Sequence, residues 1–176
     1  LSYAIEKFNL SIENRICADL GASTGGFTDV LIKSKAQKIY CVDVGKGQLD
    51  WKLVTNKKVI VLDKTNIRNF DLEKVDDKIS LITCDLSFIS IKKALIKIIN
   101  SKISDLSLIV LIKPQFELSR EKIGKNGIVR NNEFRQEAVD NITSWFSSKN
   151  WKIKGLIESP ITGAKGNKEY FLYAKK

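Results

Sequence analysis

The feature of this sequence that most constrains its fold is the alternation of short apolar runs with longer amphipathic stretches. The apolar runs are rich in Val, Ile and Leu, which is typical of buried strands. Strands are predicted at Arg15–Leu20, Lys38–Val44, Lys58–Leu62, Ile79–Cys84, Leu106–Ile112, Lys152–Ser159 and Glu169–Ala174. Helices are predicted at Gly26–Lys35, Ser90–Ser101 and Asn131–Lys149. This order predicts an α/β fold in which helices cover a mostly parallel sheet.

The end of the chain departs from this alternation. The last two predicted strands are joined by a Gly-containing turn, Pro160–Lys168, without a helix between them, so they are expected to form an antiparallel hairpin. A polar segment of about 17 residues, Pro114–Arg130, follows the fifth predicted strand. Connections this long in compact domains are usually functional or disordered. This one leaves the carboxyl end of a strand, where open α/β sheets bind their ligands.

The most informative local motif is Asp19-Leu-Gly-Ala-Ser-Thr-Gly-Gly-Phe27, which follows a predicted strand and opens a predicted helix. Glycines let the backbone approach a ligand closely, and amides at a helix N-terminus can hold an anion. An acidic residue two positions before the first glycine suits a ligand with an ammonium group, and S-adenosylmethionine has an ammonium, a carboxylate and a sulfonium. The alternative is a tight strand-to-helix turn without a ligand. The residues assigned to the cofactor here are Asp19, Gly21, Ser23, Thr24, Gly25, Gly26 and Phe27.

Two further acids stand at the ends of the next two predicted strands. Asp43 lies about one βαβ unit after the glycine loop, where a carboxylate can accept hydrogen bonds from both ribose hydroxyls of an adenosine. Asp63 could accept a hydrogen bond from the adenine amine. Either aspartate alone could equally cap its strand. Together with the glycine loop they place suitable groups at three successive strand ends.

Charged residues also mark three later strand boundaries. Asp85 ends the fourth predicted strand, Lys113 ends the fifth, and Glu169 opens the last. A lysine that closes so apolar a run is costly to bury, and burial favours its neutral amine. A neutral amine could accept a proton from a ribose hydroxyl during methyl transfer to oxygen. The alternative for Lys113 is a lysine that extends to solvent from a strand end.

Composition excludes several classes of protein. The chain of 176 residues suits one domain, and it contains no histidine, which removes Ser-His-Asp triads, Cys-His dyads and His-ligated metals, so no metal is expected. The three cysteines lie singly in apolar runs, which indicates buried free thiols and a reducing, cytoplasmic location. No apolar run is long enough to span a bilayer. The net charge of +10 suits a nucleic-acid partner, although a Lys-rich composition alone would also produce it.

These motifs resemble those of the TlyA, or hemolysin A, family of rRNA 2′-O-methyltransferases, which belong to the FtsJ-like methyltransferases. The resemblance runs along essentially the whole chain. It rests on Gly21–Asp29, Val42–Lys52, Asp85–Ser90, Lys113–Glu117, Gly124–Arg130 and Ser159–Glu169. It implies a Rossmann-like, seven-stranded methyltransferase fold, S-adenosylmethionine as cofactor, and a ribose hydroxyl of ribosomal RNA, of cytidine in particular, as the target.

The resemblance also assigns roles to residues. FtsJ-like enzymes use a Lys-Asp-Lys-Glu tetrad, and the matching positions are Asp85, Lys113 and Glu169, with Asp85 also beside the cofactor. The first lysine would fall immediately before Leu1. A small RNA-binding domain is expected upstream of residues 1–176, and the chain does open within an amphipathic helical pattern. The oligomeric state is left open.

Two other functions fit parts of the pattern. The family name suggests a membrane-lysing hemolysin, but the sequence contains neither a spanning segment nor a basic amphipathic helix with a clean apolar face. The other alternative is an inactive methyltransferase fold that only binds RNA. The intact glycine loop and the three tetrad residues argue against it.

Overall fold

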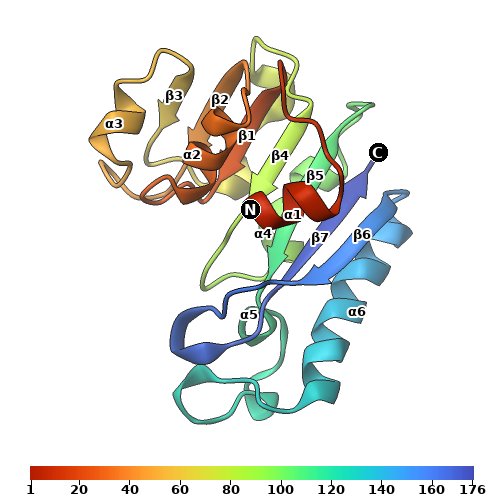
Figure 1. The fold of residues 1–176 in the computed structure, drawn as a ribbon. Helices are drawn as coiled ribbons and strands as arrows, with labels where there is room; N and C mark the ends of the chain where they lie inside the picture. Colours follow the sequence, from red (N-terminus) through yellow and green to blue (C-terminus); the bar gives the residue numbers. More distant parts are fainter.

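The computed structural model describes residues 1–176, apart from the side chain of Ala164. A sheet of seven strands forms its centre, in the order β3-β2-β1-β4-β5-β7-β6 (Figure 1). The strands are β1 (Ile16–Leu20), β2 (Lys38–Val42), β3 (Val59–Leu62), β4 (Leu81–Cys84), β5 (Ser107–Ile112), β6 (Lys152–Glu158) and β7 (Tyr170–Lys175). β1 to β5 are parallel, and β7 pairs antiparallel with both β5 and β6. The predicted parallel sheet with a C-terminal antiparallel hairpin is confirmed.

Helices cover both faces of this sheet. The α-helices are α1 (Ser2–Lys7), α2 (Gly26–Lys33), α3 (Trp51–Val54), α4 (Ile91–Ile99), α5 (Pro114–Glu117) and α6 (Asn132–Ser148). One buried cluster joins the sheet to α4 and α6 through side chains such as Leu95 and Phe146. A second cluster on the other face includes Ala4, Leu31 and Leu53 from α1, α2 and α3.

The two long helices form where the sequence predicts them, for local reasons. α4 buries Ile91, Ala94, Leu95, Ile98 and Ile99, whose spacing puts them on one face of a helix of 3.6 residues per turn. α6 begins after Asn131, whose side-chain oxygen accepts a hydrogen bond of 2.8 Å from the Glu133 amide. Asn131 is the N-cap of α6, and its side chain satisfies a backbone donor that the helix leaves free.

The segment Pro114–Arg130 is more ordered than its polar composition indicates. It contains α5 and two short 3₁₀ helices, η3 (Arg120–Lys122) and η4 (Lys125–Gly127). Three further 3₁₀ helices, η1 (Ile67–Asn69), η2 (Leu72–Lys74) and η5 (Ala164–Gly166), also lie in connections. Elements of three or four residues bury too little apolar surface to show a periodic pattern.

The strand order reverses beside β1, because β2 and β3 extend the sheet to one side and β4 and β5 to the other. The connections that leave β1 and β4 at their carboxyl ends therefore diverge and open a crevice, the usual ligand site of open α/β sheets. The residues that follow β1, β2, β4 and β5 meet at this edge.

Candidate active site

The glycine loop after β1 takes a conformation that requires glycine at two positions. Gly21 has a φ of +81°, and a Cβ there would lie 2.3 Å from the backbone oxygen of Asp85. Gly25, the N-cap of α2, has a φ of +99°, and a Cβ there would lie 2.1 Å from a methyl carbon of Leu53. The loop therefore packs directly against the ends of β4 and α3, as a close backbone approach demands.

A cavity of about 550 Å³ opens beside this loop, between the carboxyl ends of β1, β2 and β4. Four residues assigned to the cofactor line it: Gly21, Ser23, Asp43 and Asp85. Both oxygens of Asp43 accept backbone hydrogen bonds of 2.8 Å, Oδ2 from Ser23 and Oδ1 from Gly45. Asp43 thus ties the glycine loop to its own loop, and each oxygen keeps a lone pair for a second donor. This space is called the first cavity below.

Other residues of the glycine-loop motif point elsewhere. Asp19 is fully buried, and its carboxylate accepts hydrogen bonds of 2.7 Å from Thr28 and 3.0 Å from Thr83. Burial raises the pKa of Asp19 to about 6, against the lowering effect of these two hydrogen bonds. The ring of Phe27 lies 6.1 Å from the ring of Phe171, measured between centroids. Asp19 and Phe27 therefore contact other side chains of the protein and stabilise the glycine loop from within the core.

The remaining assigned residues do not line the first cavity. Thr24, Gly25 and Gly26 line a smaller hollow of about 280 Å³ between α2 and α3. The Asp63 carboxylate accepts a hydrogen bond of 2.7 Å from the Gly47 amide. Asp63 is not among the described residues that line the first cavity. Asn66, Ile67 and Arg68, which follow it in the sequence, line the cavity instead.

The three residues matched to the tetrad come together at the ends of β4, β5 and β7. Lys113 Nζ lies 2.5 Å from Asp85 Oδ1 and donates a hydrogen bond of 3.1 Å to Ser87 Oγ. The side chains of Lys113 and Asp85 are 13% and 33% exposed, so the ion pair is only partly accessible to water. Burial raises the pKa of Glu169, and the charge of Lys113 opposes this shift. The predicted grouping of these three side chains is therefore present.

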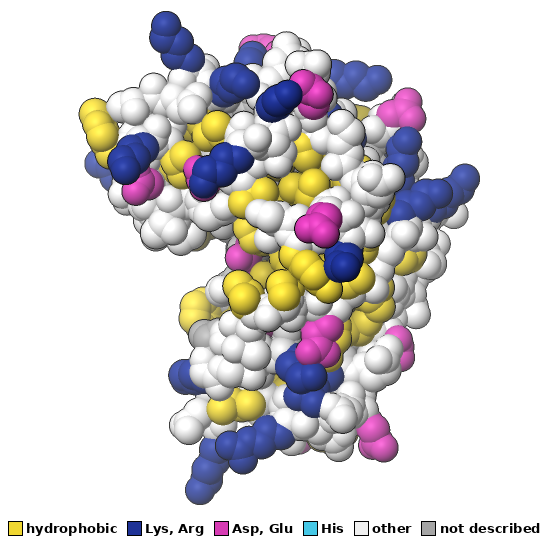
Figure 2. Space-filling view, viewed as in Figure 1, with side chains coloured by type: hydrophobic (Ala, Val, Ile, Leu, Met, Phe, Trp, Pro, Cys, Tyr) yellow, Lys and Arg dark blue, Asp and Glu magenta, His cyan; other side chains and the backbone are white. Residues whose placement is uncertain are grey.

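A second cavity, of about 370 Å³, lies on the other side of this ion pair. Its lining includes Lys113 and Glu169, and it shares Ser87 and Phe88 with the first cavity. The Phe88 side chain is 91% exposed, and its φ of +66° is unusual for an aromatic residue. Its ring lies 5.2 Å from that of Phe116, between centroids. Figure 2 shows the surface indented near the connection from β4 to α4.

The start of the chain also approaches this ion pair. Burial lowers the pKa of the Leu1 amino group, and the charge of Asp85 raises it by a smaller amount. The family resemblance places the first tetrad lysine immediately before Leu1. The assignment of a tetrad lysine to that position stays a prediction.

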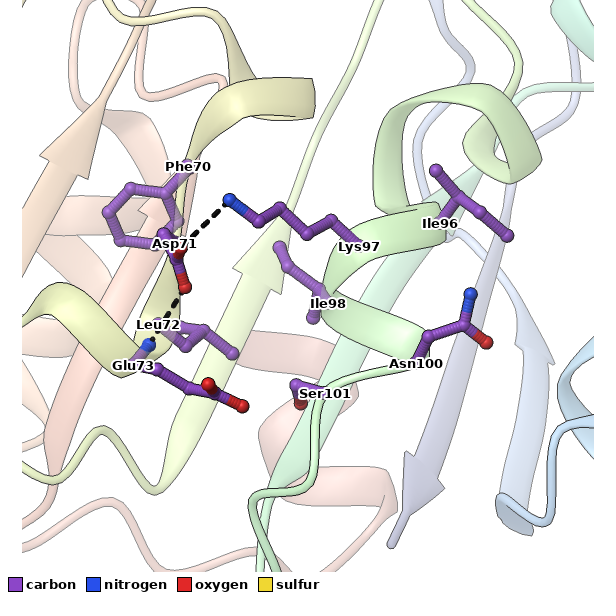
Figure 3. A pocket seen from close by; sticks show the side chains of 9 residues that line it. All are labelled: Phe70, Asp71, Leu72, Glu73, Ile96, Lys97, Ile98, Asn100 and Ser101. Carbon is purple, nitrogen blue, oxygen red and sulfur yellow. Dashed lines mark hydrogen bonds and ion pairs between the residues drawn. The ribbon is translucent and has the colours of Figure 1, made fainter.

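A cavity away from this edge has a different character (Figure 3). It has a volume of about 380 Å³ and lies between the η1–η2 segment and the end of α4. Lys97 reaches across it to Asp71, at 2.9 Å, and Asp71 also accepts from the Glu73 amide. None of the residues assigned from the sequence lines it, so we do not treat it as the active site.

Several lining residues were missed by sequence reasoning. Val44, Gln48, Leu86 and Ile89 line the first cavity, and Gln115 and Asn167 line the second. All of them follow strand ends or lie in the motifs that carry the family resemblance. Their nearness in sequence to an assigned residue is therefore the one feature that could have identified them as lining residues. Their side chains carry no charge that would single them out.

The chain belongs to the FtsJ-like methyltransferase family, whose family model matches residues 1–176. Solved S-adenosylmethionine-dependent methyltransferases of low identity share the fold, such as one from Listeria monocytogenes with a TM-score of 0.71 and 14% identity that covers 99% of this chain and 96% of that one.

Among relatives, the chain is 37% identical to the 16S/23S rRNA (cytidine-2′-O)-methyltransferase TlyA of Mycobacterium tuberculosis, over 98% of this chain and 64% of that protein. It is 42% identical to Hemolysin A of Brachyspira hyodysenteriae, over 98% of this chain and 72% of that protein. A Streptococcus thermophilus structure that carries the name hemolysin gives a TM-score of 0.93 at 38% identity, over 99% of this chain and 63% of that one. The chain thus spans less than two thirds of the length of the tuberculosis relative.

Proposed function

We propose that the protein transfers the methyl group of S-adenosylmethionine to the 2′-hydroxyl of a ribose, of cytidine in particular, in ribosomal RNA. The observation that carries this proposal is the Asp85–Lys113 ion pair, which lies between two cavities. A pocket for a methyl donor and a pocket for a methyl acceptor must meet at such a point. The name of the tuberculosis relative supports the choice of cytidine and rRNA.

The residues of the first cavity fit S-adenosylmethionine. Its volume of about 550 Å³ is within the usual range for small-molecule sites. Asp43 stands at the end of β2, where a carboxylate can accept both ribose hydroxyls, and Ile67 and Leu86 offer apolar surface to an adenine ring. When bound, this cofactor supplies an electrophilic methyl group on its sulfonium.

Lys113 would act as the base. Methyl transfer to oxygen requires removal of the hydroxyl proton, and in a chain without histidine a lysine amine is the strongest base near the site. The Lys113 ammonium would first release its own proton to solvent water through the second cavity, which it lines, and the neutral amine would then accept the proton from the 2′-hydroxyl. Asp85 would orient Lys113 through their ion pair, and the charge of nearby Glu169 would help to balance that of Lys113.

Exposed cations around the second cavity suit an RNA substrate. Lys165 lines this cavity, and Arg120, Lys125 and Arg130 are exposed on the α5–α6 connection that forms one of its walls. Figure 2 shows Lys and Arg side chains at the end of the molecule where the α5–α6 and β6–β7 connections lie. Lysine and arginine side chains contact phosphates without regard to sequence, so this surface would position the RNA and leave selection to the cavity.

The expected cellular setting follows from the same proposal. The three cysteines are buried and free, which is consistent with a reducing cytoplasm. In the described residues, every helix is too short or too polar to cross a bilayer. As the family resemblance implies, we also expect a small RNA-binding domain ahead of this one, and ribosomal subunits as partners.

The direct test uses the full-length protein, methyl-labelled S-adenosylmethionine and ribosomal subunits. We expect label in the RNA, and digestion to nucleosides should place it in 2′-O-methylcytidine. Label on a base, or no label with any ribosomal RNA under conditions where the cofactor binds, would contradict the proposed function.

A further inference from the structure

Two separate connections form the walls of the second cavity. One wall comes from the α5–α6 connection, through Ile123, Asn126 and Gly127, and the other from the β6–β7 connection, through Lys165 and Glu169. The two lie side by side at the lower end of Figure 1. They are about 40 residues apart in the sequence, so something must fix their separation.

The Asn167 side chain makes that connection. It is only 3% exposed, and its Oδ1 accepts a hydrogen bond of 2.9 Å from the Val129 amide. Its Nδ2 donates a hydrogen bond of 2.8 Å to the Gly127 carbonyl. One buried amide therefore bonds both a donor and an acceptor of the opposite wall, which a side chain of any other size or polarity would not reproduce.

The wall that Asn167 holds is not a conformation the backbone adopts easily. Asn126 and Gly127 both have a positive φ, of +64° and +76°. A positive φ costs conformational free energy at Asn126, because this residue has a Cβ. The short bonds within the loop run from Gly127 to Gly124, at 3.1 Å, and from Gly124 to Ile128, at 3.0 Å. External bonds from Asn167 stabilise this arrangement.

Asn167 also closes the turn that presents Glu169. Its carbonyl accepts a hydrogen bond of 2.8 Å from the Gly163 amide. Gly163 packs directly against the Glu169 carboxylate, because a Cβ at Gly163 would lie 1.9 Å from Glu169 Oε1. Movement of Asn167 would therefore disturb the cavity wall and the turn behind Glu169 together.

We propose that Asn167 is a positioning residue that joins the two walls of the second cavity and so fixes the shape in which the target nucleotide is received. This inference rests on the proposed function for its kinetic consequence, but the connection itself can be measured without any substrate.

The test compares Asn167→Ala with Asn131→Ala in the full-length protein. Asn131→Ala also removes a side-chain bond to a backbone amide, at the start of α6, but touches neither cavity. For Asn167→Ala we expect KM for ribosomal subunits to rise about tenfold or more, with the Kd of S-adenosylmethionine changed less than about threefold. Asn131→Ala should leave both constants within about twofold.

A second readout does not depend on activity. The Val129 amide donates to Asn167 in the native protein, so its hydrogen exchange should accelerate at least about tenfold in Asn167→Ala, while exchange in α4 stays unchanged. If Asn167→Ala does not fold, Gly127→Ala serves instead, because a φ of +76° strains a side chain there although space is open. It should raise KM in the same way.

The outcomes separate the two proposals. Unchanged Val129 exchange, or an unchanged KM in a folded variant, would overturn the role of Asn167. Absence of methylation by the wild-type protein would overturn the proposed function, while the exchange measurement would still decide whether Asn167 joins the walls.

Discussion

At the scale of single residues, Asp43 offers a simple test of how the first cavity holds an adenosine. Asp43→Ala should weaken S-adenosylmethionine binding by roughly 1–3 kcal/mol, because ribose hydroxyls lose a charged acceptor. Calorimetry gives the Kd directly. Glu13→Ala, which removes an exposed partner of Lys35, is the matched control and should change nothing. An unchanged Kd in Asp43→Ala would reject the ribose role.

Asp19 makes a different kind of contribution, one that depends on pH. Burial raises its pKa from 3.8 to about 6 in the folded protein, so folding favours the protonated form. The resulting stabilisation is present below the unfolded pKa and is lost as pH rises through the native pKa. Relative to wild type, the unfolding free energy of Asp19→Asn should therefore rise by about 3 kcal/mol between about pH 3.5 and about pH 7.

Denaturant unfolding across this pH range measures the difference. Asp76→Asn changes an exposed carboxyl and should show no such trend. A difference between Asp19→Asn and wild type that stays constant with pH would show that the native carboxyl titrates normally.

At the scale of elements, α4 illustrates how the sequence pattern becomes stability. Leu95 is fully buried in the cluster between the sheet and α6, whereas its neighbour Ile96 is 41% exposed. Leu95→Ala should lower the unfolding free energy by about 2–5 kcal/mol, since it leaves a cavity in the core. Ile96→Ala should change it by at most about 0.5 kcal/mol. Equal effects in thermal or denaturant unfolding would contradict this burial pattern.

The same scale explains which elements were predictable. The seven strands and the two long helices show sustained apolar patterns, and they were predicted to within a few residues. α3 and the 3₁₀ helices were missed because three or four residues carry no period. α5 was missed because its sequence, Pro-Gln-Phe-Glu, has no apolar face.

The sequence indicates which assigned residues lie together only where topology dictates their position. Asp43, Asp85 and Lys113 follow parallel strands, whose carboxyl ends meet at one edge, so their grouping follows from the strand order. Asp19 differs because it lies within β1, where side chains alternate between faces, and it turns under α2 towards Thr28. The Asp19 side chain faces its hydrogen-bond partners Thr28 and Thr83. No local sequence pattern reveals that these two residues lie beside it. Asn167 is similar, because its partners are about 40 residues away.

At the scale of the whole molecule, the net charge of +10 predicts salt-sensitive RNA binding by the full-length protein. Each phosphate that a lysine or arginine neutralises releases counterions, so affinity should fall with salt with a log–log slope of several units. S-adenosylmethionine binding over the same salt range is the internal control and should vary little. A flat RNA response would show that the Lys-rich composition has no role in binding.

The proposed methyl transfer depends on what Lys113 does at the junction of the two cavities. Lys113→Ala removes the amine but leaves the glycine loop and Asp43 untouched, so the first cavity should keep its affinity for S-adenosylmethionine. Lys113→Arg keeps a positive charge beside Asp85 but cannot supply a neutral base, because a guanidinium does not give up its proton in proteins.

The decisive measurement is therefore single-turnover methyl transfer to ribosomal subunits by the wild type, Lys113→Ala and Lys113→Arg, with cofactor Kd measured on each. We predict that both variants bind S-adenosylmethionine within about threefold of wild type and that both lose methylation to a similar, near-complete extent. Substantial methylation by Lys113→Arg would contradict the account, since Lys113 would then act only through its charge.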